Sequence, residues 1–200
     1  MMLKLLKYIS IVISLICSNV FGQTINRYGT TAANFLEIGV GSRATSMGDA
    51  YVAVANDVSS IYWNPAGLSN VSSSSALFMV QPWLVDIDML FAGGAVVVPN
   101  VGVLGLGITH LDYGEMDVTN LEYQDGTGER FGASDMAATF TFSRKIVSWF
   151  SFGSSMKYIS SNIWHSSASA FAVDLGVLVN TKFFSFTGND KDGMNIGMSI

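Results

Sequence analysis

The sequence predicts an all-β protein, an antiparallel transmembrane β-barrel with a small helical segment ahead of its first strand. Half of the residues are hydrophobic and only 12% are charged. Beyond the N-terminus, no apolar run approaches the ~18 residues that a membrane-spanning helix needs. Several segments instead alternate between large apolar and small or polar side chains, which is the period of a sheet with one apolar face.

The N-terminus has the organisation of a secretory signal peptide. Two lysines precede an uncharged apolar run over 8–17, and small and polar residues follow up to Gly22. Cleavage after Gly22 removes Cys17, the only cysteine, so the mature exported chain cannot rely on disulfides. Lipidation of Cys17 is the less favoured alternative, because a bulky isoleucine precedes it. We therefore assign 1–22 to a signal peptide.

The net charge argues against one class of partner. The whole chain carries a formal charge of −5, and loss of the two signal-peptide lysines makes it more negative. Binding to phosphate backbones needs a basic face, so we expect no nucleic-acid partner.

Residues 23–71 are predicted to form a hatch, a plug segment rich in Gly, Ala and Ser. A short helix is expected over 46–56, because Met47, Tyr51 and Val54 could share one face. The sharpest motif of the hatch comprises Asn64, Pro65, Ala66 and Gly67. It is either an element that gates a path through the barrel or a rigid turn before the first strand, since Pro fixes φ and Asn favours turns.

Residues 72–200 are predicted to contain the barrel strands. Seven are expected, at 73–80, 87–98, 101–112, 132–145, 150–161, 169–181 and 194–200. From Phe171 to Val179 the odd positions are all large and apolar, whereas the even ones are smaller or polar. Asp174, Thr139 and Thr141 are the candidate polar residues of the lumen.

The connections between strands support a membrane barrel. Most alternate between short turns and longer loops, and Trp83, Tyr113, Trp149 and Trp164 fall near predicted connections. The longest loop, 112–130, holds six carboxylates. Their spacing matches no compact calcium cage, so a solvated loop is favoured over a metal or partner site.

Seven strands leave a barrel open. The sequence reaches Ile200 within an alternating segment, and an open sheet in lipid would leave backbone groups unpaired at several kcal/mol each. We therefore expect a truncated chain that forms about half a barrel, unless another chain completes it.

Catalysis is not expected. Only His110 and His165 could serve as a positioned base, and the abundant serines indicate no particular nucleophile. We expect no catalytic residues, no metal site and no cofactor.

The block 41–68, GSRATSMGDAYVAVANDVSSIYWNPAGL, resembles the PorV/PorQ family, as do 113–116, 126–131 and 157–159. Members of that family are similar to the FadL long-chain fatty-acid transporters, whose N-terminal hatch also carries an Asn-Pro-Ala motif. The resemblance implies an outer-membrane barrel of about fourteen strands, of which this chain would be the N-terminal half.

The same resemblance implies a function in protein secretion and surface attachment, as a shuttle of the type IX secretion system in the bacterial outer membrane. Its partners would be outer-membrane lipid and exported proteins or secretion components. One alternative is a FadL-like transporter of fatty acids or other hydrophobic small molecules. Structural or adhesive surface barrels and soluble periplasmic β-proteins are further alternatives.

Overall fold

The computed structural model describes residues 33–85, 87–181 and 193–200. All of the described residues belong to one compact unit, Ala33–Ile200. The predicted signal peptide, its cleavage site and the predicted hatch residues 23–32 lie outside the described residues.

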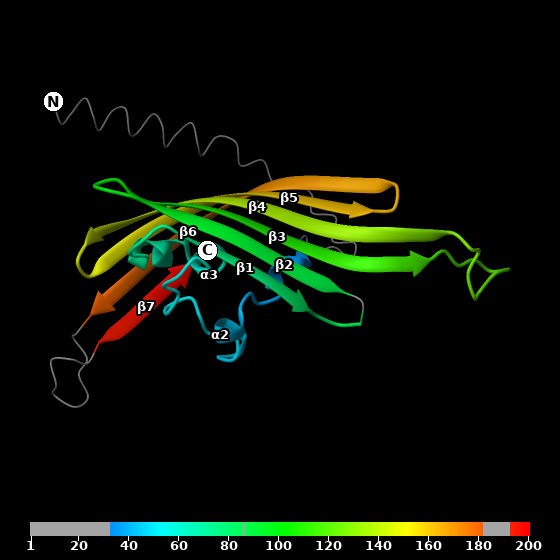
Figure 1. The fold of residues 1–200 in the computed structure, drawn as a ribbon, viewed down its shortest axis with the longest axis horizontal. Helices are drawn as coiled ribbons and strands as arrows, with labels where there is room; N and C mark the ends of the chain where they lie inside the picture. The colour runs from blue at the N-terminus through cyan, green and yellow to red at the C-terminus, as the bar shows by residue number, and fades with distance from the viewer. Residues whose placement is uncertain (1–32, 86, 182–192) are drawn as a thin grey trace, which may run out of the picture. The chain divides into compact units, whose positions relative to one another are not determined.

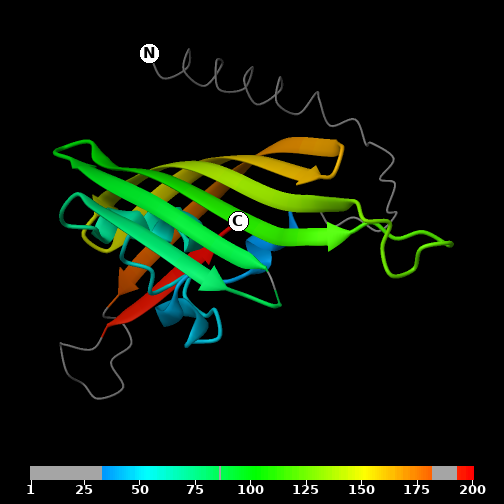
Figure 2. The ribbon, with the colours of Figure 1, turned by 45° about the vertical axis from the view of Figure 1, so that its right-hand side comes forward.

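The described unit is built on one antiparallel sheet of seven strands. The strands are β1 (Ser75–Pro82), β2 (Asp88–Val98), β3 (Gly102–Asp117), β4 (Arg130–Val147), β5 (Phe150–Ile163), β6 (Ser166–Thr181) and β7 (Met194–Ser199). They pair in sequence order, each with the next, and the sheet curls into a half-barrel (Figures 1 and 2). The predicted all-β class and all seven predicted strands are confirmed, and β1 and β7 form the two edges of the sheet within the described residues.

The two faces of the sheet differ because side chains alternate along each strand. We call the face that contacts residues 33–71 the inner face and the opposite one the outer face. On β5, buried Ser151, Gly153 and Ser155 point inward, and the intervening Phe152 and Met156 point outward and are exposed. The predicted alternation is therefore present in space.

Strands β3 to β6 are longer than the sequence predicted, and β3 is also irregular. The β3–β4 ladder shifts register between Asp112 and Glu115, which marks a bulge around Tyr113 and Gly114. Tyr113 was expected beside a loop. It lies instead within β3, and its hydroxyl donates a hydrogen bond of 2.6 Å to Asp135 Oδ2 on β4.

The hatch, described over 33–71, consists of short helices and turns beneath the curled sheet (Figure 1). These elements are the 3-10 helices η1 (Asn34–Glu37) and η2 (Pro65–Asn70) and the single-turn helices α2 (Ser42–Thr45) and α3 (Ser60–Trp63). The helix expected over 46–56 is wrong. The chain forms turns there, with Gly48 at φ 62° and Asp49 at φ 63°, a left-handed conformation that a helix cannot continue through.

The main hydrophobic core lies between hatch and sheet. Its hatch side comprises Phe35, Val40, Val58, Ile61 and Leu68, and its strand side comprises Met89, Phe91, Ala95, Val103, Leu111 and Ala137. The hatch thus supplies about half of the buried apolar side chains, and it is an integral part of the fold.

Candidate functional site

Asn64 joins the hatch to the sheet. Its side chain is fully buried, and its Nδ2 donates hydrogen bonds to the carbonyl oxygens of Val52 (2.9 Å) and Val177 (3.2 Å), the second on β6. Its Oδ1 accepts a bond of 3.0 Å from the backbone N–H of Ala66, which caps η2. One buried amide therefore pairs three backbone groups from two distant parts of the chain.

Pro65 and Ala66 lie directly against the backbone of the sheet. A Cβ atom added to Gly153 on β5 would fall 2.3 Å from the carbonyl carbon of Pro65. One added to Gly176 on β6 would fall 2.2 Å from Asn64 Oδ1 and 2.8 Å from the Pro65 ring. Only glycine permits this approach, so the hatch motif and the strand glycines form one complementary contact.

The glycine contact extends on both sides of this motif. Added Cβ atoms at Gly105 and Gly107 on β3 would meet Ile61 within 3.0 Å, and one at Gly197 on β7 would meet Ala53 at 2.6 Å. Small inner-face residues on β3, β5, β6 and β7 thus accommodate the hatch. Gly67 serves the same purpose within the hatch, because a Cβ there would lie 2.4 Å from the Ala55 carbonyl oxygen.

The predicted lumen residues Thr139, Thr141 and Asp174 all lie on the inner face, in two different settings. Thr141 is fully buried and shares a 2.8 Å hydrogen bond with Ser155. Asp174 forms a 2.7 Å ion pair with Lys157, in which both side chains are at most one-fifth exposed.

Sequence reasoning missed three partners on the hatch side of the sheet, namely two inner-face side chains and one backbone carbonyl. Lys157 was not singled out, although it has the same parity in β5 as Ser155. Ser143, whose hydroxyl donates to the carbonyl oxygen of Ala66 at 3.1 Å, was also missed. The third is the backbone carbonyl of Val177 on β6, which accepts from Asn64 although the valine side chain points to the outer face.

Tyr62 and Trp63 fix the first part of the hatch. The Tyr62 hydroxyl donates to the carbonyl oxygens of Leu36 and Ile38, and Trp63 Nε1 donates to Val40 O at 2.9 Å. Burial raises the pKa of Tyr62 well above its ordinary value, and the negative charges of nearby acidic residues add to this. The hydroxyl therefore stays protonated as a donor.

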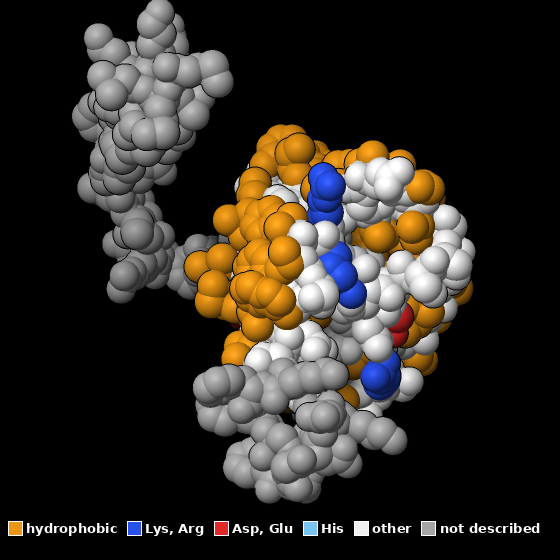
Figure 3. All heavy atoms as spheres, turned by 90° about the vertical axis from the view of Figure 1, so that its left-hand side faces the viewer, with side chains coloured by type: hydrophobic (Ala, Val, Ile, Leu, Met, Phe, Trp, Pro, Cys, Tyr) orange, Lys and Arg blue, Asp and Glu red, His pale blue; other side chains and the backbone are white. Residues whose placement is uncertain are grey.

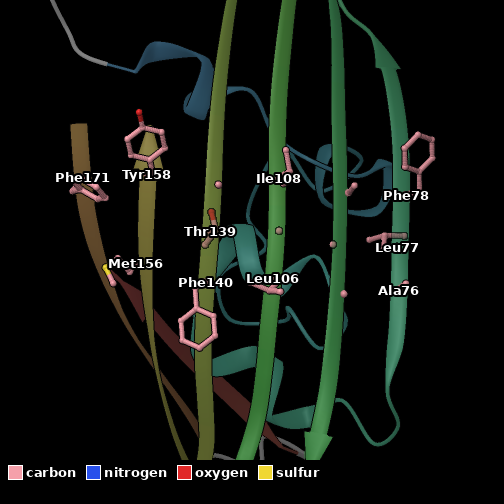
Figure 4. A pocket seen from close by; sticks show the side chains of 15 residues that line it. Ala76, Leu77, Phe78, Leu106, Ile108, Thr139, Phe140, Met156, Tyr158 and Phe171 are labelled. Atoms are coloured by element: carbon pink, nitrogen blue, oxygen red, sulfur yellow. The ribbon is translucent and has the colours of Figure 1, made fainter. Parts of the chain in front are cut away.

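The outer face exposes large apolar side chains over the centre of the sheet. They include Phe78, Leu106, Ile108, Phe140, Tyr158 and Phe171 (Figure 4). Between β1 and β3, the outer side of β2 carries only Ala92 and Gly94 at this height. A shallow apolar hollow of about 780 Å³ follows from this difference in size.

The two ends of the sheet differ in charge. We call the end with the β1–β2, β3–β4 and β5–β6 connections the loop end, and the end with the β2–β3 and β4–β5 connections the turn end. At the loop end, Arg130 pairs with Glu115 at 2.9 Å and with Asp117 at 3.1 Å. Arg144 and Lys145 lie at the turn end, and Figure 3 shows basic side chains beside hydrophobic ones there.

Exposed tryptophans occur at both ends. Trp83 and Trp164 lie in connections of the loop end, and Trp149 lies in the β4–β5 connection of the turn end. Each is about half exposed. Trp164 also contacts Phe131, at 5.8 Å between ring centroids. Aromatic side chains therefore flank the apolar outer face at either end.

The described residues offer no cluster of ligating side chains for a metal ion. His110 is on β3 and points to the outer face, whereas His165 stacks on Trp164 in the β5–β6 connection. The two histidines are thus separated. Among the residues that the structure describes, no helix is both long and apolar enough to cross a membrane.

The geometry defines the protein as an all-β chain, a curled seven-stranded half-barrel with an inner face closed by a tightly packed hatch. No family model matches the chain, and no curated protein matches it.

Proposed function

We propose that this chain forms the hatch and part of the wall of an outer-membrane β-barrel of the PorV/PorQ type, and that this barrel acts in protein secretion and surface attachment. The family and its role come from the resemblance in the sequence. The observation that carries the membrane part is the opposite character of the two faces of the same strands.

The height of the outer apolar surface supports membrane insertion. On β6 the outward residues run from Phe171 to Val179 without a polar side chain. At ~3.3 Å per residue these nine positions extend about 26 Å, and a strand tilt of about 40° reduces this to about 20 Å, which is most of the apolar band of about 25 Å in a membrane barrel. Tryptophans at both ends fit the two membrane–water interfaces.

The open edges are consistent with a larger barrel. Unpaired backbone groups are costly in lipid, so β1 and β7 each require a neighbouring strand there. A closed barrel of about fourteen strands, as the resemblance implies, would pair both edges.

The fixed hatch favours a secretion role over transport of small molecules. Asn64 donates a hydrogen bond to β6, Ala66 accepts a buried one from Ser143 on β4, and the backbone of this motif contacts glycines on β5 and β6. A transporter that opened at this motif would have to break all of these contacts together. A barrel that presents exported proteins needs only a stable scaffold and accessible loops.

The test is mass spectrometry of what co-purifies with the full-length protein, extracted gently from the outer membrane of its own host. We expect an exported protein or a secretion component, which should be lost when loop residues 118–127 are deleted. Bound fatty acids or other apolar small molecules would contradict the proposal in favour of a transporter. Release by carbonate without detergent would contradict membrane insertion itself.

An anchor or adhesin gives a different result. Deletion of 118–127 would then abolish surface adhesion, and no exported protein would co-purify. A matched control replaces the same ten residues with a Gly/Ser linker, which keeps the loop length and removes only its side chains.

A further inference from the structure

A groove of about 310 Å³ lies at the turn end of the half-barrel. Its walls come from three parts of the chain, namely the end of η2 at Ser69, the β2–β3 turn around Asn100, and the last part of β4. Its size falls within the range typical of ligand sites.

Among the described residues, the groove is lined by basic side chains and by no acidic one. Arg144 and Lys145 both line it, and none of its lining residues is Asp or Glu. No ion pair joins either side chain to a carboxylate in the part of the chain that the structure describes. By contrast, the arginine at the opposite end of the same strand, Arg130, is paired with two carboxylates.

The two cations approach the groove from opposite faces. Arg144 has the parity of Phe140 and Phe142 and so belongs to the outer face, and Lys145 follows it on the inner face. The groove therefore lies across the rim of the wall, which is where the outer apolar surface ends.

Apolar groups surround the cations. The cross-strand partner of Arg144 is Phe152, and Val101 and Trp149 in the adjacent turns are about half exposed. A free phosphate ion would gain nothing from these side chains. A molecule with an anionic head and hydrocarbon chains could bind the cations and the apolar surface together.

We propose that this groove binds the phosphodiester headgroup of an anionic phospholipid, whose acyl chains lie along the outer face. This inference rests on the proposed membrane insertion and goes beyond it, because insertion alone requires no headgroup preference. Arg144 contributes a planar guanidinium suited to two phosphate oxygens, and Lys145 adds a second positive charge.

The test uses the full-length protein in mild detergent, incubated with phosphatidylglycerol or with phosphatidylcholine of the same chain length and analysed by native mass spectrometry. We expect phosphatidylglycerol to be retained preferentially. Arg144→Gln should lower that preference about fivefold, and adding Lys145→Gln should remove it, as each basic residue near an anionic surface contributes roughly that factor. The matched control is Arg130→Gln, which removes one exposed arginine from the other end of β4 and should leave the preference unchanged.

Equal retention of the two lipids, or an equal loss in Arg130→Gln and Arg144→Gln, would overturn the proposal. An excess of inorganic phosphate at constant ionic strength should not displace the lipid; displacement would mean that the groove is a phosphate site. Flotation with pure phosphatidylcholine vesicles distinguishes a failure of the headgroup proposal from a failure of the proposed membrane insertion. A protein that inserts there without lipid preference contradicts only the headgroup site, and one that inserts into no vesicle contradicts the proposed membrane barrel as well.

Discussion

The same strands make the inner and outer faces of the sheet, but the two faces differ in the burial and size of their side chains. On β6, the inner residues Gly176 and Leu178 are buried, whereas the outer residues Val173 and Leu175 are exposed. Inner side chains are small wherever the hatch backbone touches the strand. Many outer side chains over the centre of the sheet are large and apolar although nothing in the described residues covers them. The hatch thus determines the size of inner residues, and the proposed lipid surroundings would account for the apolar outer ones.

A valine at Gly176 is the strongest way to break the inner face. Its Cβ would overlap Asn64 Oδ1 and the Pro65 ring, neither of which can move without losing buried hydrogen bonds. We expect Gly176→Val to lower the free energy of unfolding by about 3 kcal/mol, measured by urea titration in detergent micelles. Gly94→Val on the outer face is the matched control, because the nearest atom to its added Cβ is 4.0 Å away. Similar losses in both variants would contradict the assigned contact.

An arginine at Leu106 tests the outer face. Leu106 is exposed near the centre of the apolar surface, so in a bilayer its replacement places a charge in hydrocarbon. We expect Leu106→Arg to lower stability in phosphatidylcholine vesicles by about 2–3 kcal/mol. Asn162→Arg, an exposed outward position at the loop end of β5, should have almost no effect. A neutral effect of Leu106→Arg would indicate that this face contacts water.

Asn64→Asp tests the hydrogen bonds between hatch and sheet at constant size. Aspartate can still accept from Ala66 N–H but cannot donate to the carbonyl oxygens of Val52 and Val177. We expect a loss of about 2 kcal/mol at a pH where aspartate is ionised, in the same urea titration. Asn56→Asp provides the control, because Asn56 is exposed and bonds only Arg43. If this motif is a gate, Asn64→Asp should also increase the release of a dye encapsulated in vesicles. If it is a rigid anchor, the variant should lower stability without increasing dye release.

Tyr62 gives the smallest expected effect and a pH dependence. Because its pKa in the folded protein is raised above the unfolded value of about 10, its contribution to stability is fully present below pH ~10. Above that pH the unfolded chain ionises and the contribution is progressively lost. Tyr62→Phe should cost about 1 kcal/mol at neutral pH and should reduce the fall in stability between about pH 10 and 12. The control Tyr123→Phe, in the exposed loop, should leave the stability at neutral pH and its fall at high pH as they are in the unmodified protein.

The sequence was informative about the strands because alternation is a local property. All seven strands, and the inward orientation of Thr139, Thr141 and Asp174, follow from period 2 alone. The helix expected over 46–56 failed because periodicity does not report the left-handed conformation of Gly48 and Asp49. The low helix propensity of Gly48 and Asp49 outweighed the apolar face that the spacing of the neighbouring residues predicted.

The contacts of the candidate site could not be predicted in the same way. Asn64 and Val177 are separated by 113 positions, and their contact depends on where the hatch docks. The pairing of Lys157 with Asp174 depends on the register of β5 against β6, which no single strand encodes. The basic groove could not be predicted either, because three separate segments of the chain form its walls.

The most direct test of the account places nitroxide labels on single cysteines along β6, in membranes. The predicted cleavage removes Cys17, the only cysteine of the printed sequence, and any cysteine elsewhere in the full-length protein is first replaced by serine. Labels at the outward Val173 and Val177 should collide mainly with oxygen, which concentrates in lipid, and labels at the inward Ala170 and Ala172 mainly with a water-soluble nickel chelate. Equal access of the nickel chelate to all four positions would contradict a lipid-facing outer surface.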